Sequence, residues 1–150
     1  MAPDDAAALK LRAEDEDDLP VISAFLQDAL VPVCDLAYVP SDRTFLFVAN
    51  RFRWEDGIHC AVREGGFRRT LCGVTFGEVV AVSYCGFRRS ENGRILSLLA
   101  LRPENGLVRL EFSGDAAIRL EVARILCHAR DLGEPWPTTW QPRHDLEERA

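Results

Sequence analysis

The sequence predicts an α+β domain that consists mostly of antiparallel β-sheet, with one N-terminal amphipathic helix. Apolar residues recur with clear helical spacing in one segment, at residues 18–30, and with a period of two from residue 31 onward. Turn sequences separate the alternating segments roughly every eight to twelve residues. Because no regular succession of strand, helix and strand is present, a parallel nucleotide-binding sheet is improbable. The chain of 150 residues fits a single domain, 1–150.

The helix follows a short predicted strand at residues 9–13. Asp17, directly before the segment DLPVISAFLQDAL, is the expected N-cap, and Pro20 falls in the first turn, where its missing N–H costs nothing. Helical spacing places five apolar residues on one face, namely Leu19, Ile22, Phe25, Leu26 and Ala29. We therefore expect this face to pack against the sheet.

Alternating segments joined by turn sequences account for most of the remaining chain. PSDR, EGG and PENG are turn sequences between such segments, and Asn105-Gly106 favours positive φ. Strands are predicted at residues 31–39, 44–54, 58–63, 67–76, 78–85, 94–101, 107–112 and 117–122. This number of short strands is typical of an antiparallel barrel or a two-sheet sandwich.

The segment at residues 123–132 fits two descriptions. Val122, Ile125, Leu126 and Ala129 have helical spacing with Gly133 as a C-cap, whereas Ile125, Cys127 and Ala129 also alternate. We predict a short helix, with a strand as the alternative. A terminal helix over an open barrel would be pleckstrin-homology-like by analogy. The predicted core spans about residues 8–132.

The last segment, residues 133–150, is rich in proline and is expected to be extended. Trp136 and Trp140 are expected to hold this tail to the body of the domain, and the final charged residues are expected to fray.

Composition and charge exclude several classes of protein. The chain has no apolar run long enough to span a bilayer, and its acidic N-terminus is unlike a signal peptide, so we expect a cytoplasmic protein with no membrane contact. Five dispersed cysteines without a C-x-x-C pair indicate reduced thiols. The net charge of −6 opposes non-specific nucleic-acid binding. Nevertheless, residues 51–94 contain eight arginines against five acids.

The motif NRFRW at residues 50–54 interleaves arginines with aromatics. Alternation from Leu46 and Val48 predicts that Phe52 and Trp54 face the core. Arg51 and Arg53 would then emerge into solvent on the opposite face, begun by Phe45 and Phe47. Their expected partners are the protein's own acids: Glu55, Asp56 and the acidic N-terminal segment.

Catalytic and metal-binding signatures are weak. His59-Cys60 and Cys127-His128 contain zinc-ligand types, but neighbouring strand residues point to opposite faces and cannot chelate together. There is no nucleophile elbow and no glycine-rich phosphate loop followed by a helix. We therefore expect no cofactor, metal or catalytic residue, and we favour a protein that is not an enzyme.

One family resemblance covers nearly the whole chain, from about Leu9 to Asp145. The ordered set LKLRAEDEDDLPVISAFLQDALV, DLAY, RFRWE, ILSLLAL, AIRLEV and PWPTTWQPRHD resembles the alphaproteobacterial family labelled domain of unknown function 2948. The resemblance implies a small single-domain cytoplasmic protein. It implies no activity, cofactor or catalytic residue.

Three functional hypotheses follow. The first is a non-catalytic β-rich binding module that acts through protein contacts, with a partner or with its own copy. The second is RNA or other nucleic-acid binding through arginine-bearing hairpins. The third is a small-ligand or enzyme site in a barrel interior, using Cys60, Cys127 or the histidines. The candidate partner-binding residues are Arg51, Arg53, Arg68, Arg69, Trp136 and Trp140.

Overall fold

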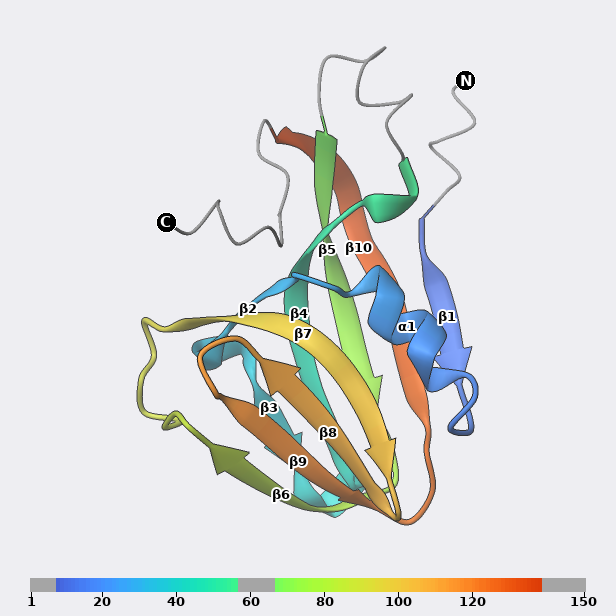
Figure 1. Ribbon diagram of the computed structural model, residues 1–150, viewed down its shortest axis with the longest axis vertical. Coiled ribbons are helices and arrows are strands. Elements are labelled where there is room, and N and C mark those ends of the chain that lie inside the picture. Colours follow the sequence, from blue (N-terminus) through green and yellow to red (C-terminus); the bar gives the residue numbers. More distant parts are fainter. Residues whose placement is uncertain (1–7, 57–66, 139–150) are drawn as a thin grey trace.

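The computed structural model describes residues 8–56 and 67–138, which form ten strands, one α-helix and three 3-10 turns (Figure 1). The helix is α1 (Leu19–Phe25), and it follows strand β1 rather than leading the fold. The 3-10 turns lie at Val33–Asp35, Pro40–Asp42 and Trp54–Asp56. The strands are β1 (Lys10–Ala13), β2 (Leu30–Pro32), β3 (Ala37–Val39), β4 (Thr44–Phe52), β5 (Phe67–Phe76), β6 (Val79–Cys85), β7 (Ile95–Glu104), β8 (Leu107–Phe112), β9 (Ala117–Val122) and β10 (Cys127–Thr138).

The strands pair antiparallel in one open sheet. Its order is β1-β10-β5-β4-β2-β7-β8-β9-β6, with β3 paired to β4 beside this path. Within the described ranges β1 and β6 are therefore the two ends of the path, and these pairings do not close a barrel. The predicted fold of mostly antiparallel sheet with one helix is confirmed.

The sheet curves so that its two halves share one core. In Figure 1, strands β7, β8 and β9 lie in front of β3 and β4. The Tyr38 hydroxyl donates to the Val79 carbonyl at 3.0 Å, and the Val79 N–H donates to the Arg43 carbonyl at 2.8 Å. These bonds join the start of β6 to the β3–β4 hairpin. Buried side chains from both halves, including Phe45, Phe47, Leu98, Leu110 and Ile118, belong to one apolar cluster.

The helix packs by its predicted face. Leu19, Ile22 and Leu26 are buried, and the Ser23 hydroxyl accepts a hydrogen bond from the Leu101 N–H at 3.0 Å, which ties α1 to β7. The N-cap is Asp18 instead of Asp17, and its side chain makes no capping hydrogen bond. The amphipathic pattern therefore predicted the buried face of the helix correctly, but it placed the N-cap one residue too early.

Most predicted hairpins are confirmed. Val39 pairs with Thr44 around PSDR, and Glu104 pairs with Leu107 around a turn in which Gly106 has φ of +78°. Strands β5 and β9 have the predicted bounds. The predicted strand at 58–63 and its EGG turn lie outside the described residues.

The predicted helix at residues 123–132 is wrong, because strand β10 occupies residues 127–138. Cys127 and Ala129 are buried while His128 and Arg130 are exposed, which is the alternation of a strand. β10 lies between β1 and β5, and those two strands supply its hydrogen-bond partners. The local sequence does not reveal that β1 and β5 pair with this segment. Because the segment is a strand, the terminal helix of the pleckstrin-homology analogy is absent from the described residues.

The predicted tail is partly inside the sheet. It was assigned to residues 133–150, but β10 continues to Thr138, with an irregularity in register between Leu132 and Trp136. Residues up to 138 are therefore extended, as predicted, and residues 136–138 pair with β5. Trp140 lies outside the described residues. In the described ranges no helix is long and apolar enough to cross a membrane.

Candidate functional site

Strand β4 presents the opposite face to the core from the one predicted. Phe45, Phe47, Ala49 and Arg51 are buried, whereas Leu46 is 37% exposed. Because both sets of alternating residues in FLFVA are apolar, either face of the strand could be the buried one. The buried face ends in Arg51, and an arginine is not expected in a core, so the sequence favoured the wrong face. Arg51 is consequently a core residue. The prediction that Arg51 and Arg53 emerge into solvent is wrong for both, since the exposed fraction of Arg53 is only 3%.

Arg51 is held by two carboxylates. Its Nε and Nη2 atoms each donate to Asp131 at 2.8 Å, while Nη1 donates to Glu55 at 2.9 Å and Nη2 also donates to Glu55. The Arg51 side chain is 0% exposed and that of Asp131 is 2% exposed. Glu55 was the predicted partner. Asp131, eighty residues away, was missed because nothing in the local sequence connects it to Arg51.

The electrostatics of this triad fix the charge of Arg51. Burial by itself disfavours the charged guanidinium, but the hydrogen bonds that Arg51 donates to Asp131 and Glu55, together with their negative charges, outweigh it, so the pKa of Arg51 is raised. Bidentate geometry of this kind positions both partners closely. Arg51 therefore has a structural role, and its guanidinium is engaged on both edges.

Four further predicted residues lie beside the triad. Arg53 donates its backbone N–H to the Arg68 carbonyl at 3.0 Å, and Trp136 and Phe52 both pair with Arg69 in neighbouring strands. The Arg69 Nη1 atom donates to the Asn50 carbonyl and amide oxygens, both at 3.1 Å. Thus the structure gathers five of the six candidate residues at one end of the sheet.

Aromatic packing at this end differs from the prediction. Phe52 is buried, as expected, but it lies on the same side of β4 as Leu46 and Val48, the side away from Phe45 and Phe47. It is covered by ring contacts with Trp54 at 4.7 Å and Phe67 at 5.4 Å between centroids. Phe52 therefore cannot stack on a base.

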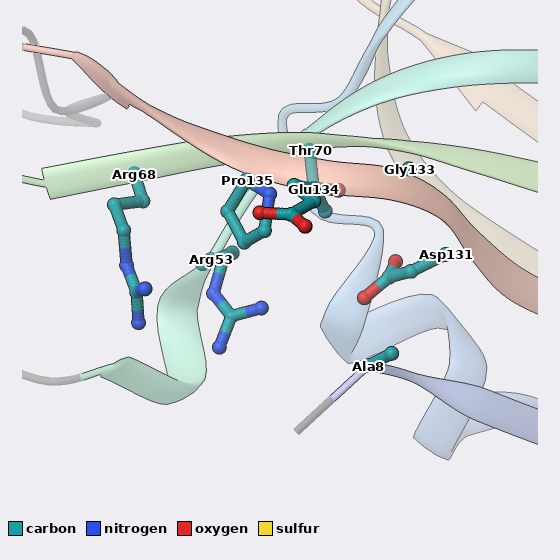
Figure 2. Close-up of a pocket in the computed structure, with 8 residues that line it drawn as sticks. All are labelled: Ala8, Arg53, Arg68, Thr70, Asp131, Gly133, Glu134 and Pro135. Atoms are coloured by element: carbon teal, nitrogen blue, oxygen red, sulfur yellow. The ribbon is translucent and has the colours of Figure 1, made fainter. Parts of the chain in front are cut away.

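A polar pocket opens beside the triad, on the inner side of β5 and β10. Its volume is about 240 Å³. Figure 2 shows the Arg53 and Arg68 side chains running side by side, with Asp131 across from them and Glu134 close above Arg53. The lining residues are Ala8, Arg53, Arg68, Thr70, Asp131, Gly133, Glu134 and Pro135. We call this space the arginine pocket.

The other side of the same strands forms a second candidate surface. Strand register places Leu46 beside Thr75, Thr75 beside His128, and His128 beside Arg12. Two residues further along the strands, the register places Val48, Gly73, Arg130 and Lys10 side by side. Another two residues along, Asn50, Leu71 and Leu132 are neighbours. We call this surface the outer face, and its exposed or half-buried apolar and basic members are Leu46, Val48, Leu71, Leu132, Trp136, Lys10, Arg12, His128 and Arg130.

The outer face combines exposed apolar and basic side chains. Leu71 is 41% exposed and Trp136 is 37% exposed. Lys10 and Arg130 are exposed next to them, and Arg12 is paired with Glu14 at 2.8 Å. The sequence reasoning found only Trp136 of this set. The missing signal was the position of β10 between β1 and β5.

Of the four cysteines that the structure describes, Cys72 and Cys127 are buried, and Cys34 and Cys85 are exposed. Burial raises the pKa of the Cys72 thiol to about 12 and also raises that of Cys127. In the described part of the chain, no group of three or more His, Cys, Asp and Glu residues is placed to hold a metal ion. Cys60 and His59 lie outside that part.

The fold and these surfaces define a β-rich α+β domain built on one curved, open antiparallel sheet. The family model described as protein of unknown function (DUF2948) matches residues 9–144. The chain belongs to this family, as the resemblance predicted. No curated protein and no solved structure matches it significantly.

Proposed function

We propose that this protein is a non-catalytic binding module whose outer face docks on an acidic, partly apolar surface of another protein. The supporting observation is that the exposed Leu46, Leu71 and Trp136 share this face with the exposed cations Lys10 and Arg130. Large apolar side chains surrounded by a polar rim are typical of protein interfaces, and tryptophan and arginine are enriched among their energetic anchors.

Charge favours a different protein over a second copy of the chain. In a two-fold symmetric contact the same patch meets itself, so Lys10 and Arg130 of the two copies would meet like charges. A partner with carboxylates opposite these cations gains electrostatic complementarity and faster association. We therefore assign the face to an acidic partner.

Nucleic-acid binding is the second candidate, but the geometry supports it less. Arg51 is held by Asp131 and Glu55, and Phe52 is buried, so the NRFRW motif offers neither of these side chains to RNA. On the outer face, Trp136 is the described aromatic that could stack on a base. We also propose a cytoplasmic location, because the exposed thiols of Cys34 and Cys85 are unpaired, as is typical of reducing compartments.

Site-specific photo-crosslinking tests the proposal in living cells. A photoreactive phenylalanine analogue replaces Leu71 on the outer face, and in a control chain it replaces Val80 on β6, which is 45% exposed. We expect one protein to crosslink from position 71 and not from position 80. We also expect the added substitution Arg130→Glu to remove that crosslink without changing the melting temperature of the chain.

Three outcomes would contradict the proposal. They are equal crosslinking from both positions, no crosslinked protein from position 71, and crosslinking of position 71 to RNA in place of protein. The last of these would favour the nucleic-acid hypothesis.

A further inference from the structure

We propose that the arginine pocket binds a small zwitterion of the α-amino-acid class. This inference is independent of the outer face, because the pocket lies on the inner side of β5 and β10 while the docking residues lie on the other side. It rests on three features of the pocket: charges of both signs, a buried hydroxyl, and a rigid floor.

Charged side chains of both signs line the pocket. Arg53 and Arg68 extend next to each other, while Glu134 and Asp131 present carboxylates (Figure 2). A guanidinium carries five N–H donors in a planar fork that matches a carboxylate, so each arginine can hold a ligand carboxylate besides its other contacts. Glu134 is exposed and can accept from a ligand ammonium.

The buried triad strengthens this polarity. Arg51 contributes one positive charge, and Asp131 and Glu55 contribute two negative charges, so the triad has an excess of one negative charge. Asp131 lines the pocket and brings this excess to its floor. A bare anion would meet that charge unfavourably, whereas a ligand ammonium would be attracted to it. The site therefore suits a zwitterion better than a simple anion.

Thr70 adds a polar group with spare capacity. It is 0% exposed, it lines the pocket, and its hydroxyl makes one hydrogen bond, to the Leu71 carbonyl, at the long distance of 3.5 Å. A buried hydroxyl that is so weakly bonded gains free energy from a better partner. A ligand carboxylate held by Arg53 and Arg68 would supply one.

The floor of the pocket is held in place before any ligand arrives. Besides its two bonds from Arg51, the Asp131 carboxylate accepts the Leu9 N–H at 2.8 Å, so three donors from two other segments hold it in place. Such preorganisation reduces the entropic cost of binding. The volume of about 240 Å³ lies below the usual range for drug-sized ligands, which limits the ligand to a small molecule.

Isothermal titration calorimetry of the full chain tests this assignment with a matched ligand panel. The panel contains α-amino acids with small, apolar and amide side chains, together with the carboxylic acid and the amine that correspond to each. We expect at least one amino acid to bind about tenfold more tightly than either single-charge counterpart, because each lost charged hydrogen bond weakens affinity by at least that factor.

Variants locate the binding within the pocket. Glu134→Gln and Thr70→Val should each weaken affinity for the amino acid. The Glu134→Gln variant should also lose the preference for a ligand ammonium, so that it binds the amino acid and the corresponding carboxylic acid with similar affinity. Arg119→Gln removes an exposed arginine on β9, far along the sheet order, and should leave affinity unchanged. Because Glu134 is exposed, its variant should fold normally, and melting temperatures check this for all three.

The inference is overturned by any of three results. No panel member binds at millimolar concentration, the carboxylic acid binds as tightly as the amino acid, or Glu134→Gln binds the amino acid with wild-type affinity. None of these results bears on the docking role of the outer face.

Discussion

Arg51 and Asp131 form a buried bidentate ion pair across eighty residues of sequence, with both N–O distances at 2.8 Å. Arg51 lies on β4 and Asp131 on β10, and these strands flank β5 on its two sides. Asp131 also accepts the Leu9 N–H, which brings the segment before β1 into the same network. The Arg51–Asp131 pair therefore fixes the relative positions of three segments at the end of the sheet.

Asp131→Asn should destabilise the fold strongly. It leaves the buried guanidinium of Arg51 with one carboxylate, and removal of one partner from a buried ion pair typically costs about 3–5 kcal/mol. The measurement is the free energy of unfolding from urea denaturation. Glu111→Gln instead weakens the solvent-accessible ion pairs of Glu111 with Arg102 and Arg109 and should have little effect. Equal effects of the two substitutions would show that burial of the triad does not matter.

Gly86 and Gly106 provide a matched pair of turn substitutions. Both have positive φ, +79° and +78°, but a Cβ at Gly86 would overlap the Asp115 carbonyl oxygen, while a Cβ at Gly106 has open space. Gly106→Ala should cost about 1–2 kcal/mol from backbone conformation alone. Gly86→Ala should cost at least about 1–3 kcal/mol more, because backbone must shift. Thermal unfolding of both variants measures the difference, and equal melting temperatures would contradict the packing at Gly86.

The buried thiols predict loss of stability in alkaline solution. An unfolded cysteine has a pKa of 9.0, whereas burial raises the pKa of Cys72 to about 12. Between these values the unfolded chain binds fewer protons than the folded chain, so stability falls as the pH rises through that window, by on the order of 1 kcal/mol per pH unit. Urea midpoints measured from pH 9.0 upward within this window give the slope, and Cys72→Ala should make it shallower. An unchanged slope in that variant would contradict the assignment.

Thiol labelling distinguishes the same residues at neutral pH. Cys34 and Cys85 are exposed, and Cys72 and Cys127 are buried with raised pKa values. A maleimide or disulfide reagent should therefore modify the first pair rapidly and the second pair only after unfolding. Peptide mass spectrometry assigns the modified sites. Rapid native modification of Cys72 would show that the inner face of β5 is open to solvent.

Local patterns predicted those parts of the fold that local chemistry determines. The apolar face of α1, the PSDR and PENG turns and the bounds of β5 and β9 follow from spacing and turn residues. The patterns failed where a distant strand decides the outcome. Residues 127–132 are a strand because β1 and β5 flank them, and β4 buries Arg51 because Asp131 is there to receive it.

The candidate site divides for the same reason. Sequence position alone grouped Arg51, Arg53, Arg68 and Arg69 as one basic surface. In the structure Arg51 is internal, Arg53 and Arg68 line a pocket, and Arg69 lies on the other side of β5. The outer face could not be predicted, because Lys10, Leu71 and Arg130 become neighbours only through the order of β1, β10 and β5.

The most direct test of the proposed function is the affinity of the purified chain for the protein crosslinked at position 71. Three chains are compared: wild type, the outer-face variant Leu71→Asp with Arg130→Glu, and the control variant Val80→Asp with Arg119→Glu. The account predicts that the outer-face variant binds at least about a hundredfold more weakly, since an apolar anchor and a charge contact are both lost, while the control variant binds like wild type. Wild-type affinity in the outer-face variant, with its fold intact, would contradict the account.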